Sequence, residues 1–168
     1  DVTSAQLTDA ASVLRTLWRG EMILGHDGPL GTYDYLNLGV AVPPVPILLV
    51  TMSPNTLRLA GCIADGVVLH TFFSDEATIA AVETVRAAAA EAGRDPASVR
   101  IWSVLATVPD QLDEDDRLRR LYGRLATYLQ GYPDVLMRAN GWRRDDLERI
   151  RESPAFAGAR GPIDATAT

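Results

Sequence analysis

The chain has 168 residues, of which 47% are hydrophobic, and its formal net charge is −6 at pH 7. This length and composition suffice for one sizeable core. The acidic balance argues against nucleic acid and anionic membrane surfaces as partners. No apolar run approaches the length of a membrane span, and no secretory signal opens the chain. All 16 basic residues are arginine, which excludes mechanisms that use a lysine of this segment.

The single cysteine and the two ends of the chain give weaker indications. Cys62 cannot form an internal disulfide, so we expect a small buried side chain in a cytoplasmic protein. The chain begins with Asp1 rather than methionine and stops in a polar run over 164–168. We therefore expect a fragment, a central-to-late piece of a longer protein.

The first forty residues predict a helix followed by an excursion. Residues 4–20 show an apolar stripe at helical spacing, and Gly20 ends the helix. Residues 21–42 contain several glycines and then an extended pattern, which favours a hairpin or an irregular excursion. His26 and Asp27 could form a ligand or acid–base pair there, but two polar residues in a turn are more often only a turn.

Residues 45–108 predict a βαβαβ series. The wholly apolar run 47–50 is typical of a strand buried on both faces. Ser53 and Pro54 then signal a helix start, because serine is a favoured N-cap and proline suits the first helical position. A long helix is expected from Asp75 to Gly93. The last strand, within 99–108, has apolar residues in both alternating sets, so Trp102 is predicted to be core.

The remaining residues predict helices. An acidic cluster at 113–116 opens a helix whose arginines we expect to pair with that acidic turn, in preference to forming a basic groove. Shorter helices follow within 133–140 and 143–152, so 113–152 forms a helical insertion, and residues 153–168 form a tail. The alternating strands and helices imply a parallel sheet with right-handed crossovers in a single domain, 1–168.

The turn after the first strand of this series is the leading candidate site. A helix that begins just past a strand presents free N–H groups and the positive end of its dipole, an arrangement that suits phosphate. The turn, Thr51-Met52-Ser53-Pro54, lacks the glycine that lets a backbone close on phosphate. On this geometry alone, an ordinary capped helix is the preferred interpretation.

A family resemblance favours the phosphate-binding interpretation of this turn over an ordinary capped helix. The stretch 46–67, with its apolar strand, Ser-Pro turn, Leu-Ala-Gly helix and closing Ala-Asp-Gly, resembles the bacterial luciferase-like monooxygenase superfamily, and more narrowly its coenzyme F-420 (deazaflavin) branch. Three further stretches resemble family features in the same order: Leu-Trp-Arg-Gly at 17–20, His-Asp-Gly-Pro at 26–29, and Ala-Gly-Arg-Asp-Pro at 92–96. Together these parts cover residues 10–108.

The resemblance implies an α/β fold, part of a (β/α)8 TIM barrel, and specific site residues. It implies that the backbone of Thr51, Met52 and Ser53, with Asn55, contacts the cofactor phosphate. Ser53 departs from the glycine that the family often has there, which puts close backbone approach in doubt. His70 and Thr71 end the next strand, on the face where barrel chemistry takes place, and are candidate pocket residues.

The function implied is that of an oxidoreductase moving a hydride between F-420 and a small organic substrate. The alternatives are an FMN-dependent monooxygenase on the same barrel and a non-catalytic flavin-binding barrel. No catalytic residue and no metal site is assigned. The expected partner is a small molecule rather than nucleic acid or a membrane, and a homodimer is left open. An isolated segment of this kind is expected to leave its sheet edges uncovered and to be inactive.

Overall fold

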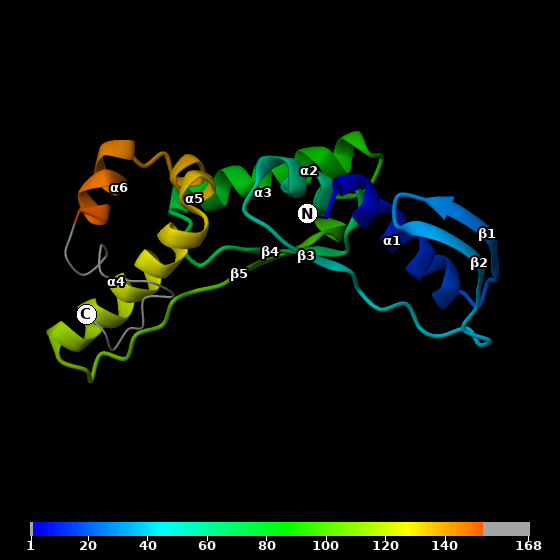
Figure 1. Cartoon of the computed structure of the whole chain (residues 1–168), viewed down its shortest axis with the longest axis horizontal. Coiled ribbons are helices and arrows are strands. Elements are labelled where there is room, and N and C mark those ends of the chain that lie inside the picture. Colours follow the sequence, from blue (N-terminus) through cyan, green and yellow to red (C-terminus); the bar gives the residue numbers. More distant parts are fainter. Residues whose placement is uncertain (1, 153–168) are drawn as a thin grey trace. The chain divides into compact units, whose positions relative to one another are not determined.

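The computed structural model describes residues 2–152, so the expected tail at 153–168 lies outside the described residues. The chain divides into two compact units, one formed by Asp1–Val68 and Val82–Trp102, the other by Leu69–Ala81 and Ser103–Thr168. Figure 1 shows the elements in chain order. In the described part of the chain, no helix is both long and apolar enough to cross a membrane.

The first unit begins with a capped helix and a hairpin. Helix α1 (Ser4–Trp18) starts at Thr3, whose side chain accepts a hydrogen bond from the Gln6 N–H, while the Gln6 side chain accepts one from the Thr3 N–H. This reciprocal arrangement is a capping box. Strands β1 (Ile23–Gly28) and β2 (Gly31–Leu36) then pair antiparallel, with His26 opposite Tyr33. Of the hairpin and the irregular excursion expected for residues 21–42, the structure therefore has the hairpin.

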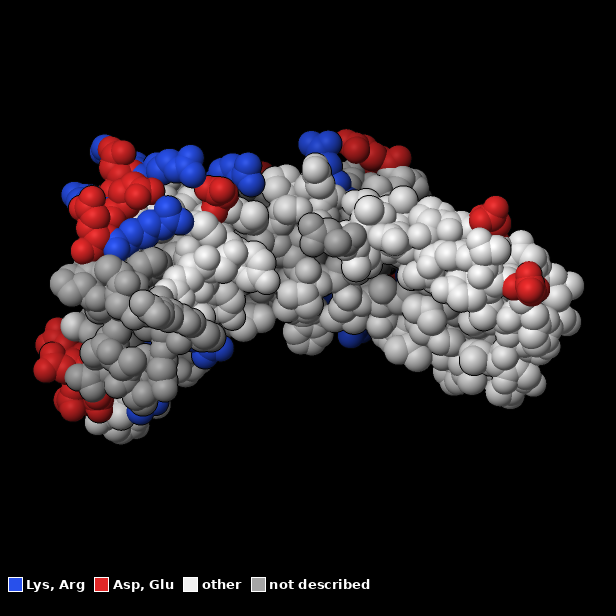
Figure 2. Space-filling model, viewed as in Figure 1, with Lys and Arg blue, Asp and Glu red and all other residues white. Residues whose placement is uncertain are grey.

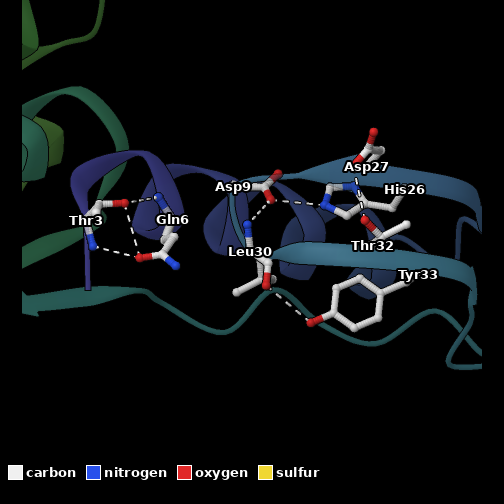
Figure 3. Close-up of polar contacts among 8 residues, drawn as sticks. All are labelled: Thr3, Gln6, Asp9, His26, Asp27, Leu30, Thr32 and Tyr33. Atoms are coloured by element: carbon white, nitrogen blue, oxygen red, sulfur yellow. Dashed lines mark hydrogen bonds and ion pairs between the residues drawn. The ribbon is translucent and has the colours of Figure 1, made fainter. Parts of the chain in front are cut away.

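Asp9 of α1 holds the hairpin to the helix, as Figure 3 shows. Its carboxylate lies 3.0 Å from Nε2 of His26 and accepts a 2.9 Å hydrogen bond from the Leu30 N–H. Asp27, the sequence neighbour of His26, instead accepts a hydrogen bond from the Thr32 hydroxyl. The hydrogen bond from Leu30, together with His26, lowers the pKa of the Asp9 carboxyl below its usual value of 3.8.

Acid is therefore expected to loosen this hairpin. Because the folded-state pKa of Asp9 is depressed, its stabilising effect is complete above the unfolded value and is lost as the pH falls from about 5 through the folded pKa. Asp9→Asn should remove this pH dependence and lower stability at neutral pH. Amide exchange of the hairpin between pH 3 and pH 7 would measure it, with Asp27→Asn as the control. An unchanged exchange profile for Asp9→Asn would contradict the assignment.

The second part of the first unit is a three-stranded sheet in the order β3-β4-β5, formed by β3 (Leu48–Val50), β4 (Gly66–Leu69) and β5 (Arg100–Ser103). β3 and β4 run parallel, with Leu49 opposite Val67. Helix α2 (Pro54–Ile63) connects them, so the predicted βαβ unit is present. A short 3-10 helix (Pro96–Ser98) precedes β5.

The burial predicted for the outer strands is wrong. Leu48 and Val50 of β3 are 44% and 78% exposed, and Trp102 of β5 is 53% exposed, whereas Val67 of the central strand is fully buried. The reason is position, because β3 and β5 are the edges of the described sheet. Figure 1 also shows α2 and the later part of α3 on one side of it only. Cys62, predicted to be buried, is exposed on α2.

Helices α2 and α3 (Asp75–Glu91) approach closely because one of them has no side chain at the contact. A Cβ atom built on Gly61 would lie 2.8 Å from Cβ of Ala88 and 3.0 Å from the Ala89 nitrogen. Past the end of α3, Arg94 donates hydrogen bonds to the carbonyls of Gly61 and Ala64, the latter at 2.7 Å. The side chain of Arg94 thus satisfies carbonyls that the end of α2 leaves open.

The second unit contains three helices: α4 (Glu114–Gly131), α5 (Pro133–Asn140) and α6 (Arg144–Arg151). The side chain of Asp113 caps α4, as the acidic start predicted. The apolar core of this unit consists of Leu129, Leu136, Met137 and Leu147, with Phe72, Phe73, Leu125 and Tyr128 packed against it. Over α5 and α6 the charged side chains of both signs alternate on the surface (Figure 2).

Candidate functional site

The turn between β3 and α2 is an N-capped helix start. The Ser53 hydroxyl accepts a 3.2 Å hydrogen bond from the Thr56 N–H, and Pro54 occupies the first turn. This is the local structure that Ser-Pro predicts. The carbonyl of Ser53 also accepts from the Leu57 N–H, which begins the helical hydrogen-bond series.

The backbone N–H groups of this turn differ in what they already bind. The Thr51 N–H donates to the Val68 carbonyl at 3.2 Å, so it belongs to the sheet, and the Ser53 N–H donates to the Thr51 hydroxyl. The N–H groups of Met52 and Asn55 have no hydrogen-bond partner in the described part of the chain. Thr51 is buried, Met52 and Ser53 are half-buried and Asn55 is exposed. Two open donors at the positive end of a helix dipole suit an anionic oxygen.

The Ala-Asp-Gly motif at the end of α2 has a role in packing and not in binding a ligand. The Asp65 carboxylate accepts a 2.8 Å hydrogen bond from the Ile47 N–H and forms a 3.0 Å ion pair with Arg15 of α1. Asp65 therefore ties the start of β3 to α1. Gly66, which follows it, is buried beside Arg100, whose carbonyl would lie 2.9 Å from an added Cβ atom. The closing Ala-Asp-Gly thus sets strand register and packing.

His70 and Thr71 follow β4 in the second unit. Nδ1 of His70 accepts a hydrogen bond from the Phe72 N–H at 3.3 Å, so a neutral ring carries its proton on Nε2. Nε2 is buried and has no hydrogen-bond partner among the described residues. Burial lowers the pKa of His70 from its usual value of 6.5, which favours this neutral form. Thr71 is half-buried.

Residues distant in sequence fix the position of this histidine. The ring of Tyr128 on α4 lies edge-on to His70 at 4.4 Å between centroids. Asn140, at the end of α5, accepts a 2.7 Å hydrogen bond from the Ser74 N–H and donates to the Phe72 carbonyl at 2.9 Å. Sequence reasoning identified Asn140 only as a helix end and Tyr128 only as part of the stretch 125–129, which fits the helical insertion that the resemblance implies. No local signal connects either residue to the segment after β4.

Comparison with known proteins gives a consistent family assignment. The family model described as "Luciferase-like monooxygenase" matches residues 2–166. A curated relative from Methanolobus tindarius, 5,10-methylenetetrahydromethanopterin reductase, is 26% identical over 135 residues, which cover 79% of this chain and 40% of the relative.

Two solved structures share the fold. One is a coenzyme F-420 dependent tetrahydromethanopterin reductase from Methanopyrus kandleri, with a TM-score of 0.68 and 20% identity, covering 96% of this chain and 47% of that one. The other is an F-420-dependent secondary alcohol dehydrogenase in complex with an F-420-acetone adduct, with a TM-score of 0.59 and 23% identity, covering 84% and 45%. The chain spans less than half the length of each of these three proteins. The predicted fold class, part of a luciferase-like barrel, is confirmed.

Proposed function

The chain belongs to the luciferase-like monooxygenase family, and from this premise we propose that it is part of an oxidoreductase that moves a hydride between coenzyme F-420 and a small organic substrate. The family match over nearly the whole chain carries the proposal. It is supported by relatives whose names include F-420 and small-molecule substrates. We include in the proposal a cytoplasmic location, which suits a chain with one cysteine.

The turn after β3 would hold the cofactor phosphate. The open N–H groups of Met52 and Asn55 are the donors that the geometry provides, and the Ser53 hydroxyl lies between them in sequence. The Thr51 N–H is engaged in the sheet, so its contribution is to fix the turn, together with its hydroxyl that accepts from Ser53. Bound F-420 supplies the hydride-carrying ring, and the protein supplies binding and orientation.

His70 and Thr71 would contribute to the pocket. The neutral His70 ring has a buried Nε2–H without a partner among the described residues, and an unsatisfied buried donor is costly unless a ligand accepts from it. A carbonyl or hydroxyl oxygen of the ring or the substrate is a suitable acceptor. The lowered pKa keeps this group a neutral donor at neutral pH.

A matched pair of variants at Ser53 tests the phosphate assignment. Aspartate and asparagine both cap helices well, but only aspartate adds a negative charge beside a bound phosphate. In the full-length protein, Ser53→Asp should weaken F-420 binding at least about tenfold, which corresponds to about 1.4 kcal/mol. Ser53→Asn should bind within a few fold of the wild type. Cofactor fluorescence during titration measures both affinities.

The same titrations separate the alternatives. If Ser53→Asp and Ser53→Asn bind F-420 equally well, the turn does not hold the phosphate. Binding of FMN without binding of F-420 would favour the FMN-dependent monooxygenase on the same barrel. If neither cofactor binds the wild-type protein, the proposed oxidoreductase function fails.

A further inference from the structure

A cavity of about 400 Å³ lies in the second unit, between the segment after β5 and helix α4. Its lining includes Val108 and Pro109 from that segment, Arg120, Arg124 and Tyr128 from α4, and Phe72 from the segment after β4. This volume is within the range of small-molecule sites. The segments after β4 and β5 leave the carboxyl ends of their strands, which is the end where barrels of this class bind ligands.

Two arginines, Arg120 and Arg124, give the described lining of the cavity a positive charge. Arg120 and Arg124 lie four residues apart and therefore on the same face of α4. Among the described residues that line the cavity, none is an aspartate or a glutamate. Among the described residues, neither guanidinium forms an ion pair or a hydrogen bond, so the pairing expected with the acidic turn of α4 does not occur for these two.

Four arginines of α6 and the residue before it, by contrast, are paired. Arg143, Arg144, Arg149 and Arg151 each form an ion pair with a nearby aspartate or glutamate. Two like charges one turn apart disfavour a helix, and this cost is removed when an anion binds both. Arginine also binds carboxylate and phosphate with paired N–H groups.

Other residues of the lining are apolar and contact one another. The rings of Phe72 and Tyr128 contact each other edge-on at 5.6 Å, and both contact the ring of His70. Val108 and Pro109 add aliphatic surface. A ligand for this cavity therefore needs an apolar or planar part as well as an anionic group.

We propose that this cavity binds the phosphate or carboxylate group of an organic anion through Arg120 and Arg124, with the apolar part of that molecule against Phe72 and Tyr128. The inference extends the proposed function by stating that the substrate carries an anionic group. The cofactor is a second source of the same chemistry, because its phosphate could reach this site instead of the turn after β3.

The test uses phenyl phosphate as the probe and the full-length protein. Isothermal titration should show binding that weakens with added salt, and phenol should bind at least about tenfold more weakly. The double variant Arg120→Gln/Arg124→Gln should lose at least tenfold in affinity for phenyl phosphate. A control with the same change in net charge, Arg58→Gln/Arg117→Gln, should keep wild-type affinity, because neither residue lines the cavity.

F-420 titrations of the same two double variants identify the source of the anion. Unchanged F-420 affinity, with phenyl phosphate affinity lost, assigns the site to the substrate. A parallel loss of F-420 affinity assigns it to the cofactor phosphate. Equal affinity of wild type and Arg120→Gln/Arg124→Gln for phenyl phosphate would overturn the proposed site. Binding of phenol to the wild type as tight as that of phenyl phosphate would also overturn it. Because phenyl phosphate needs no cofactor, these results stand even if the proposed F-420 function fails.

Discussion

Gly61→Ala is expected to destabilise the first unit by about 1–3 kcal/mol, the usual cost of forcing an extra methyl group into a close-packed contact. An added Cβ would lie 2.8 Å from Cβ of Ala88 and 3.0 Å from the backbone nitrogen of Ala89, so α2 and α3 would have to move apart. Alanine is a better helix former than glycine by about 1 kcal/mol, but that gain is smaller than the expected cost of separating the helices.

Gly131→Ala provides the matched control for this prediction. Gly131 is the last residue of α4, and a Cβ added there would meet nothing within 4 Å. The same substitution should therefore be neutral or stabilising by up to about 1 kcal/mol. Urea unfolding followed by circular dichroism measures both variants. If Gly61→Ala is as stable as wild type, the close packing of α2 on α3 is not a constraint.

Leu136→Ala is expected to cost the second unit about 2–5 kcal/mol, the range for deleting a large buried aliphatic side chain. Leu136 is fully buried in the cluster with Leu129, Met137 and Leu147, whose residues come from α4, α5 and α6. The same cluster supports Phe72 and Tyr128, so the variant should also weaken phenyl phosphate binding. Weaker binding of phenyl phosphate and a lower unfolding midpoint should therefore be observed together.

Leu118→Ala is the control on α4, because Leu118 is 40% exposed. It should change the free energy of unfolding by no more than about 0.5 kcal/mol, as is usual for surface positions. Denaturant titration of the two variants compares the same chemical change at a buried and at an exposed site. Equal destabilisation by the two would show that the cluster is not the core of this unit.

Local signals in the sequence determined where several helices begin and end, whereas the strand expected within 99–108 covers only Arg100–Ser103. Ser53 and Asp113 cap α2 and α4 as predicted, because an N-cap needs only a side-chain oxygen and the next three residues. Gly20 and Gly93 follow α1 and α3 with positive φ angles of 75° and 71°, the conformation that ends helices. The family resemblance could also be recognised from the sequence, because the residues that carry it lie in short contiguous stretches.

Only the tertiary structure decided which side chains are buried and which residues contact one another. The apolar run 47–50 reads as a fully buried strand, yet Val50 is 78% exposed, because burial depends on the neighbouring strands and on how many faces are covered. His26 is bound to Asp9, seventeen residues earlier, and not to its neighbour Asp27. The cavity around Arg120 and Arg124 likewise forms from segments that are far apart in sequence. Contacts of this kind depend on the path of the chain, which no local pattern of residues encodes.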